Sequence, residues 1–238
     1  MTDHKIVSEN EWIEARKRLL AHEKDLTHLQ EKVAEERRAL PWVKVTKNYV
    51  FETPQGKKTL SDLFAGNSQL IVYHFMFSPA WKEGCVGCSF LSDHVDGANQ
   101  HLRHHDVTYV AVSRAPLDKL IAYKKRMGWK FPWVSSEGSD FNYDFHVSFR
   151  KEELAKGEAF YNFEMTKNTM EDLHGTSVFI RDSDGTIYHT YSAYARGDER
   201  SLGTYMWLDI TPNGRNESGA MSWIKRHDQY EDAPEAAE

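Results

Sequence analysis

Two continuous apolar runs dominate the middle of the chain. They are "QLIVYHFMF" at residues 69–77 and "VTYVAVS" at 107–113, both of strand length and rich in β-branched and aromatic residues. Apolar runs without polar alternation are typical of strands covered on both faces. Mixed patterns follow them at 88–105 and 116–128 and predict helices, the second ended by Gly128. This strand–helix–strand–helix order predicts a parallel sheet with right-handed crossovers.

Shorter patterns predict further elements around this core. In chain order they are a strand within 42–53, a turn at Gly56, a helical turn at 61–66, an antiparallel hairpin at 176–194 with its turn at "DSDG", and a closing helix or strand within 204–230 that runs into a loop. The sequence therefore predicts an α/β fold.

The first 40 residues have a different pattern, polar and helix-favouring. Ser8 and Glu11 have the spacing of a capping box, and Pro41 ends the helical stretch. Apolar residues recur at intervals of roughly three to four, namely Trp12, Ala15, Leu19, Leu26, Leu29 and Val33. His22 and Thr27 interrupt the pattern, so it fits either one long helix or two shorter ones. We expect an arm that packs on the domain surface or on a partner subunit, and so can make a homo-oligomer.

We find no internal repeat and no clear linker, so we expect three parts. Residues 1–40 form the helical arm, residues 41–230 form one α/β domain, and the acidic residues 231–238 form a disordered tail. A chain of 238 residues is long enough to bury a substantial core in one such domain.

Charge and hydropathy exclude several classes of protein. The net charge of −6 gives no basic excess to neutralise phosphates, so we expect no nucleic-acid binding. The longest apolar run, 70–77, contains His74 and is too short to cross a bilayer, so we expect no membrane span. The first residues lack the apolar segment of a secretory signal. We therefore expect a soluble, cytoplasmic protein, and two cysteines in a reducing cytosol do not form a structural disulfide.

Both cysteines of the chain lie together in "EGCVGC", residues 83–88, directly after the first apolar run. This order puts Cys85 at the start of a helix, where free backbone N–H groups and the helix dipole favour a thiolate. Cys88, one helical turn later, can attack a mixed disulfide formed at Cys85 and release the product. Gly84 and Gly87 leave the backbone beside Cys85 uncrowded. We therefore expect Cys85 to be a nucleophile and Cys88 a resolving thiol, with no cofactor.

Three other interpretations of the cysteines stay open. They can be two buried, inert thiols. They can bind zinc or copper with a histidine, and His74 in the preceding strand is the candidate third ligand. They can also be incidental to a module that only binds other proteins. The histidines at 101, 104 and 105 fit a helix end better than a metal site, and spacing alone does not place His146 or His174.

Several long strings resemble one known family, DUF899. They include "YVFETPQGKKTLSDLFAG", "QLIVYHFMFSPAWKEGCVGCSFLSDHVDG" and "SVFIRDSDGTIYHTYSAYARG", and the resemblance runs from about residue 8 to Tyr230. The resemblance implies a thioredoxin-like fold of the peroxiredoxin-like branch, with a central mixed sheet flanked by helices. It also implies a dithiol–disulfide oxidoreductase, whose partners would be a thiol or disulfide substrate and an unidentified electron donor.

The thioredoxin resemblance also suggests residues around the cysteines. Thr176 or Ser177 stands where thioredoxins have a cis-proline opposite the cysteines, which disfavours ordinary binding of protein disulfides. Trp81 can shield the thiolate and offer apolar surface. Arg114, at the end of the second apolar run, can hold an anion because ligands collect beyond the carboxyl ends of parallel strands.

A thiol-dependent peroxidase of the peroxiredoxin type is the alternative activity. Cys85 would then attack a peroxide to form a sulfenic acid, and Cys88 would resolve it. The chain departs from the peroxiredoxin motif P-x-x-x-T-x-x-C, because Pro79 lies one residue too close to Cys85 and Lys82 replaces the threonine.

Overall fold

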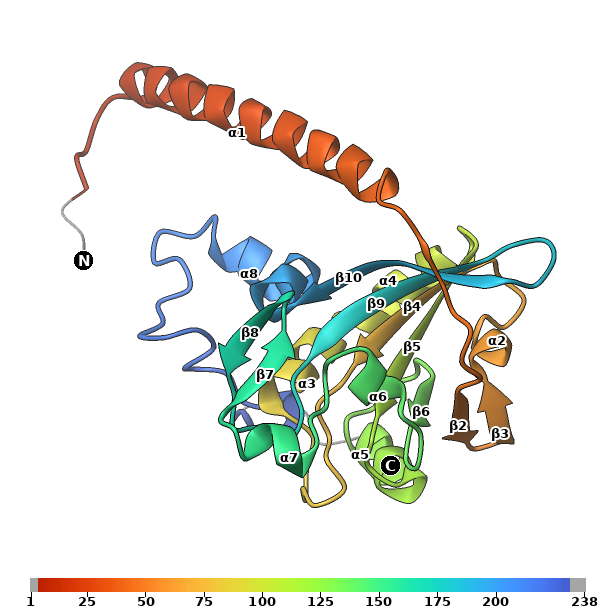
Figure 1. Ribbon diagram of the computed structural model, residues 1–238. Coiled ribbons are helices and arrows are strands. Elements are labelled where there is room, and N and C mark those ends of the chain that lie inside the picture. Colours follow the sequence, from red (N-terminus) through yellow and green to blue (C-terminus); the bar gives the residue numbers. More distant parts are fainter. Residues whose placement is uncertain (1–3, 232–238) are drawn as a thin grey trace. The chain divides into compact units, whose positions relative to one another are not determined.

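The structure is a computed structural model that describes residues 4–231 (Figure 1). The predicted acidic tail lies outside the described residues except for Glu231. Contacts within the chain divide it into two compact units, and the boundary along the sequence lies between Pro41 and Trp42.

The first unit contains one uninterrupted helix, α1 (Glu9–Arg38). Its start is fixed by the predicted capping box, because Ser8 Oγ accepts from the Glu11 N–H and the Glu11 carboxylate accepts from the Ser8 N–H at 3.0 Å. Thr27 does not break the helix, since its hydroxyl donates to the Glu23 carbonyl one turn back. Of the two alternatives left open by the sequence, one long helix is therefore the observed one.

The second unit is built on an eight-stranded mixed sheet with the order β1-β10-β9-β4-β5-β6-β2-β3. Its strands are β1 (Val43–Lys44), β2 (Val50–Thr53), β3 (Gly56–Thr59), β4 (Gln69–His74), β5 (Val107–Ser113), β6 (Trp133–Ser135), β9 (Gly175–Arg181) and β10 (Ile187–Tyr194). A separate hairpin consists of β7 (Glu158–Tyr161) and β8 (Glu164–Lys167). The helices are α2 (Leu60–Leu63), α3 (Val86–Ser92), α4 (Val95–Arg103), α5 (Leu117–Arg126), α6 (Phe141–Asp144), α7 (Lys151–Leu154) and α8 (Gly203–Leu208), with 3₁₀ turns η1 (Ala195–Ser201) and η2 (His227–Gln229).

The two apolar runs are the central strands, as predicted. β4 and β5 pair in parallel from Gln69↔Val107 to His74↔Val112, and β6 extends the parallel part beyond β5. On the other side β4 pairs antiparallel with β9, the first strand of the predicted hairpin β9–β10. A parallel pair flanked by an antiparallel hairpin, with helices on both faces, confirms the predicted α/β class and its thioredoxin-like form.

Alternate residues of the central strands face two separate cores. Tyr73 and Tyr109 contribute to a cluster with Cys88 and with apolar residues of α3 and α5. Val72 and Val110 contribute to a second cluster with residues of β2, α2 and α6. Both faces of β4 and β5 are therefore buried, which explains why their sequences lack polar alternation.

One predicted helix is wrong in extent. Residues 88–105 form part of α3 and all of α4, with a break at Asp93 and His94. The His94 ring contacts the Phe90 carbonyl at 2.8 Å, where a continuing helix would place a backbone N–H. Asp93 in turn accepts a hydrogen bond from the Trp129 ring nitrogen at 2.8 Å. Side-chain contacts with distant segments thus interrupt the helix.

No helix among residues 4–231 combines the length and the apolar character that crossing a membrane requires.

Candidate active site at Cys85 and Cys88

Both cysteines are positioned by hydrogen bonds to the backbone that follows strand β4. Cys85 is the N-cap of α3, and its N–H donates to the Met76 carbonyl at 3.1 Å. The Met76 N–H donates in return to Cys88 Sγ at 3.4 Å. The backbone just past β4 therefore fixes the position of the cysteine-bearing turn by two hydrogen bonds.

The surroundings of Cys85 favour the thiolate. The pKa of Cys85 is lowered from 9.0 to about 6, first by a hydrogen bond that the Cys88 thiol donates. The backbone N–H groups of Cys88 and Gly87 also donate to this sulfur, and the nearby His174 adds a favourable charge. Partial burial acts in the opposite direction and does not reverse the shift.

Cys88 has the opposite character. It is fully buried, and burial raises the pKa of its thiol well above the ordinary value, as does the hydrogen bond that it donates to Cys85. The Tyr73 hydroxyl and the Met76 N–H act in the other direction. One thiol of the pair is therefore an anion near neutral pH while its neighbour keeps its proton.

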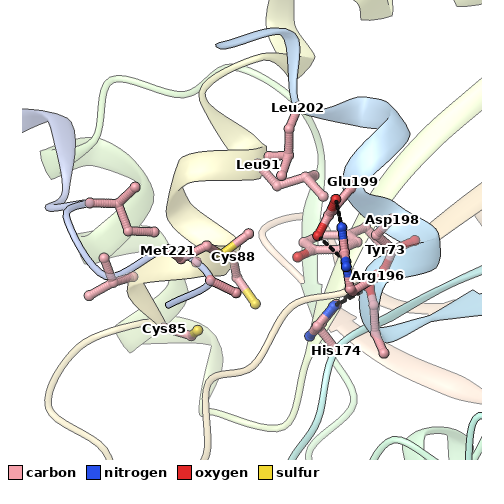
Figure 2. A pocket seen from close by; sticks show the side chains of 15 residues that line it. Tyr73, Cys85, Cys88, Leu91, His174, Arg196, Asp198, Glu199, Leu202 and Met221 are labelled. Carbon is pink, nitrogen blue, oxygen red and sulfur yellow. Dashed lines mark hydrogen bonds and ion pairs between the residues drawn. The ribbon is translucent and has the colours of Figure 1, made fainter. Parts of the chain in front are cut away.

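Cys85 and Cys88 line a cavity of about 470 Å³ (Figure 2). Much of its wall is apolar and comes from α3, from the segment around α8 and from residues 220–224, for example Leu91, Leu202, Met221 and Ile224. Met221 lies directly over the turn between the cysteines, because its sulfur is 3.1 Å from where a Cβ on Gly87 would be.

The polar part of the cavity wall contains a histidine and a carboxylate that the sequence did not single out. His174 Nε2 and Asp198 Oδ2 are 3.9 Å apart, and the same nitrogen contacts the Ala195 carbonyl at 3.1 Å (Figure 2). The Asp198 side chain is only 7% exposed, and its Oδ2 has no hydrogen-bond partner. Burial raises the pKa of Asp198 to about 6, against the effects of His174 and the Thr176 hydroxyl.

Neither residue carries a sequence signal that would place it here. Asp198 belongs to η1, after the last strand of the sheet, and is more than a hundred positions from the cysteines. His174 directly precedes β9, and only the pairing of β9 with β4 brings it to the cysteines.

The C-terminal segment that forms one side of the cavity is anchored by charged side chains. Arg226 donates to the Gly84 carbonyl and to the Tyr123 hydroxyl, both at 2.7 Å, and lies 3.0 Å from the Glu83 carboxylate. Asp228 adds an ion pair with Arg126, and His227 Nδ1 contacts the Asp93 carboxylate, each at 2.6 Å. The segment is thus attached to the loop that immediately precedes Cys85.

The structure separates the two residues predicted opposite the cysteines. Thr176 pairs with Tyr73 on the cysteine side of the sheet, and its hydroxyl hydrogen bonds to Asp198. Ser177 points to the other face, where it lies 2.9 Å from His74 Nε2 and 3.0 Å from Ser192 Oγ. Only Thr176 is therefore near the cysteine cavity.

Trp81 and Arg114 do not line this cavity. Trp81 is half-buried and packs against the core cluster that contains the cysteines. Arg114 donates to the buried Asp172 at 2.7 Å and borders a different pocket, beside Pro79 and Tyr143.

The third candidate metal ligand, His74, does not lie with the two cysteines. His74 stacks on Phe145 in the core on the opposite face of the sheet from Cys88. Within residues 4–231 no three His, Cys, Asp or Glu side chains are grouped closely enough to hold a metal ion. The alternative of a metal site at Cys85, Cys88 and His74 therefore has no support from the geometry.

Solved structures that resemble this chain do so weakly. Peroxidoxin BcpB from Mycobacterium tuberculosis is 13% identical, with 69% of this chain and 95% of that chain covered and a TM-score of 0.45. Peroxiredoxin Q from Xanthomonas campestris is 12% identical, with 65% and 85% covered and a TM-score of 0.44. Likeness at this level does not bear on the activity of this chain. A search of curated proteins finds no match.

The family comparison covers almost the whole chain. The family model described as a bacterial protein of unknown function, DUF899, matches residues 1–230. This range includes α1, every strand of the sheet and both cysteines. The chain therefore belongs to the DUF899 family, as the resemblance of its sequence strings implied.

Proposed function

We propose that the protein is a dithiol–disulfide oxidoreductase in which Cys85 is the nucleophile and Cys88 the resolving thiol. The observation that carries the proposal is the contrast between the two sulfurs. The Cys85 thiol lines a cavity and has its pKa lowered to about 6. The Cys88 thiol is buried and has a raised pKa. Thiolates attack disulfides and thiols do not, so this contrast assigns the order of attack.

The proposed reaction has two steps. The Cys85 thiolate attacks one sulfur of a disulfide R–S–S–R, forms the mixed disulfide Cys85–S–S–R and releases RS⁻, which takes up a proton. Cys88 then loses its proton and attacks Cys85 Sγ, forming the Cys85–Cys88 disulfide and releasing the second thiolate. Two electrons pass from the protein dithiol to the substrate, and an external dithiol reductant restores the reduced pair.

The surrounding groups suit the proton transfers that these steps need. His174 and Asp198 line the same cavity as both sulfurs, and Asp198 titrates near pH 6. We assign to this pair the exchange of the proton that Cys88 loses and the first leaving thiolate gains. A group of matched pKa is suited to such general acid–base work.

The test is disulfide reduction with dithiothreitol as the electron donor, followed for the protein and for two serine variants. We expect Cys85→Ser to abolish turnover. In a single turnover of the reduced protein without dithiothreitol, we expect Cys88→Ser to stop after the first half-reaction, with a substrate mixed disulfide on Cys85 detectable by intact-protein mass spectrometry. Full activity of Cys85→Ser would refute the proposal.

The peroxidase alternative has less support from the geometry. Arg196, which lines the cavity, has a side chain that is 82% exposed and pairs with Glu199 at 2.8 Å. Its guanidinium group is therefore not positioned to hold a peroxide beside Cys85. The two activities differ in the product formed on the Cys88→Ser variant. A peroxidase leaves a sulfenic acid on Cys85 after treatment with an organic hydroperoxide, which a dimedone adduct would reveal.

A further inference from the structure

The cavity beside Cys85 is a partly open hollow with a largely apolar lining, although disulfide exchange by itself requires only an accessible sulfur. Its volume of about 470 Å³ lies within the range of about 300–1,000 Å³ typical of small-molecule sites. We propose that the substrate is a small disulfide with uncharged, apolar arms that binds inside this cavity. The inference rests on the proposed function and adds the substrate class.

The first argument is access to the sulfur. Met221 covers the turn between the cysteines, and Ile224 lines the same cavity. The Met221 N–H donates to the Glu217 carboxylate at 3.0 Å, which also accepts from Tyr205. This segment narrows the approach to Cys85, which suits a small disulfide better than one held in a folded protein.

The second argument is that the segment carrying Met221 and Ile224 is attached to the loop before Cys85. Arg226 joins it to the Gly84 carbonyl, one residue before Cys85, through a side chain only 11% exposed. Hydrogen bonds to charged groups at such a buried site are among the stronger ones in proteins. The covering segment is therefore part of the site.

The third argument is charge. The apolar part of the wall offers no compensation for a charge buried against it. The unpartnered oxygen of Asp198 would repel an anionic arm, and Glu199 is already paired with Arg196 and Arg215. Arms without charge avoid both costs. The reaction stays balanced, because R–S–S–R gains two electrons and two protons to give two R–SH.

The experiment compares dialkyl disulfides of similar intrinsic reactivity, with dithiothreitol as reductant and every rate divided by the uncatalysed rate. Dimethyl, diethyl and dipropyl disulfide form the apolar series. Dithiodiglycolate and cystamine are charged, and insulin represents a protein disulfide. We expect kcat/KM to rise about fourfold per added methylene, equivalent to about 0.8 kcal/mol, and dipropyl disulfide to exceed the charged compounds and insulin by roughly tenfold or more.

Equal or faster reduction of insulin or of a charged disulfide would overturn the inference and leave the proposed function intact. The inference and the proposed function would fail together only if Cys85→Ser kept its activity. The two failures are therefore distinguishable.

Two variants of the wall test the cavity itself. Ala220→Phe should narrow it and lower kcat/KM for dipropyl disulfide by roughly tenfold, whereas the matched Ala98→Phe, at an exposed position of α4 outside the cavity, should change it by less than about twofold. Alkylation of Cys85 by the smaller iodoacetamide reports whether the sulfur stays reactive. Ile224→Ala should enlarge the cavity and move the preferred arm length up by about one methylene. An unchanged length preference in a folded Ile224→Ala variant would overturn the inference.

Discussion

Cys85 and Cys88 are the same residue type three positions apart, and they differ only in what surrounds each sulfur. The largest cause of the lowered Cys85 pKa is the hydrogen bond from the Cys88 thiol. We therefore expect the rate of Cys85 alkylation by iodoacetamide to rise with pH about a midpoint near 6. Cys88→Ala removes the donor and should move that midpoint up by about one to two units, since hydrogen bonds to charged groups are worth about 1.5–3 kcal/mol.

Cys88→Ser is the matched control, because a serine hydroxyl can still donate to the Cys85 sulfur. Its midpoint should lie between those of the native protein and Cys88→Ala. Identical midpoints in all three proteins would contradict the assigned cause.

Asp198 should make stability depend on pH in a direction unusual for a carboxylate. Its folded pKa is raised to about 6 from 3.8, so the folded protein binds this proton more tightly than the unfolded chain does. The contribution to stability is fully present below about pH 4 and is lost as the pH rises through 6. Asp198→Asn should therefore be more stable than the native protein at about pH 8, by on the order of 2–3 kcal/mol, and nearly equal at about pH 4.

The thermal midpoint at the two pH values measures this effect, and Asp209→Asn is its control. Asp209 accepts two hydrogen bonds from Arg215 at 2.8 Å, which lower its pKa. Its stabilising contribution is present above the unfolded pKa, so the control should lose stability at about pH 8. A loss of stability in Asp198→Asn at about pH 8 would contradict the prediction, because it would mean that the fold stabilises the ionised carboxylate.

At this scale the sequence predicted where the two cysteines lie and missed the groups around them. The position of Cys85 and Cys88 after an apolar run is a local pattern, and the structure places them at the start of α3 as expected. His174 and Asp198 reach the cavity through strand pairing and through η1, which no local pattern reveals. Arg114 follows β5 as predicted, but its guanidinium group is paired with Asp172 and does not line the cysteine cavity.

Among the elements, the loop that enters α3 has little room for added side-chain atoms. A Cβ on Gly84 would lie 2.7 Å from the ring of Phe75 and 3.1 Å from that of Tyr123. Phe75 is only 1% exposed and cannot move without disturbing the core. We expect Gly84→Ala to lower the free energy of unfolding by about 1–3 kcal/mol and to change the alkylation rate of Cys85.

Gly97→Ala in α4 is the matched control for urea denaturation. A Cβ there meets no atom within 4 Å, so the alanine should stabilise the helix by about 0.5–1 kcal/mol. The same sign of change at both glycines would contradict the packing argument.

The elements that the sequence predicted well are those whose pattern is determined by burial alone. β5 spans the predicted residues 107–113 because both its faces are covered. The β7–β8 hairpin was missed, since its turn places Asn162 and Phe163 at positive φ where glycine is the usual signal. The break between α3 and α4 was missed because it depends on Trp129 and Thr204, far along the chain.

At the scale of the whole molecule, α1 carries an apolar stripe with no buried side chain. A seven-residue spacing runs through four of its residues, namely Trp12, Leu19, Leu26 and Val33. Leu19 and Leu26 are 52% and 54% exposed, and such a stripe is stabilised when it packs on another helix. We propose that α1 pairs with α1 of a second copy, which is the homo-oligomer that the arm suggested.

The proposal predicts a dimer that a single charge on the stripe disrupts. Leu26→Glu puts a carboxylate at the contact and should convert the dimer to a monomer at micromolar concentrations, because a charge buried between apolar faces is costly. Leu20→Glu is the matched control, since Leu20 is also exposed, at 40%, but lies off the stripe. Light scattering with size-exclusion chromatography gives the mass of each variant. A native protein that elutes as a monomer, or a dimer that survives Leu26→Glu, would exclude pairing through α1. Dithiol activity should be the same in both variants, because the residues that line the cysteine cavity all belong to the second unit.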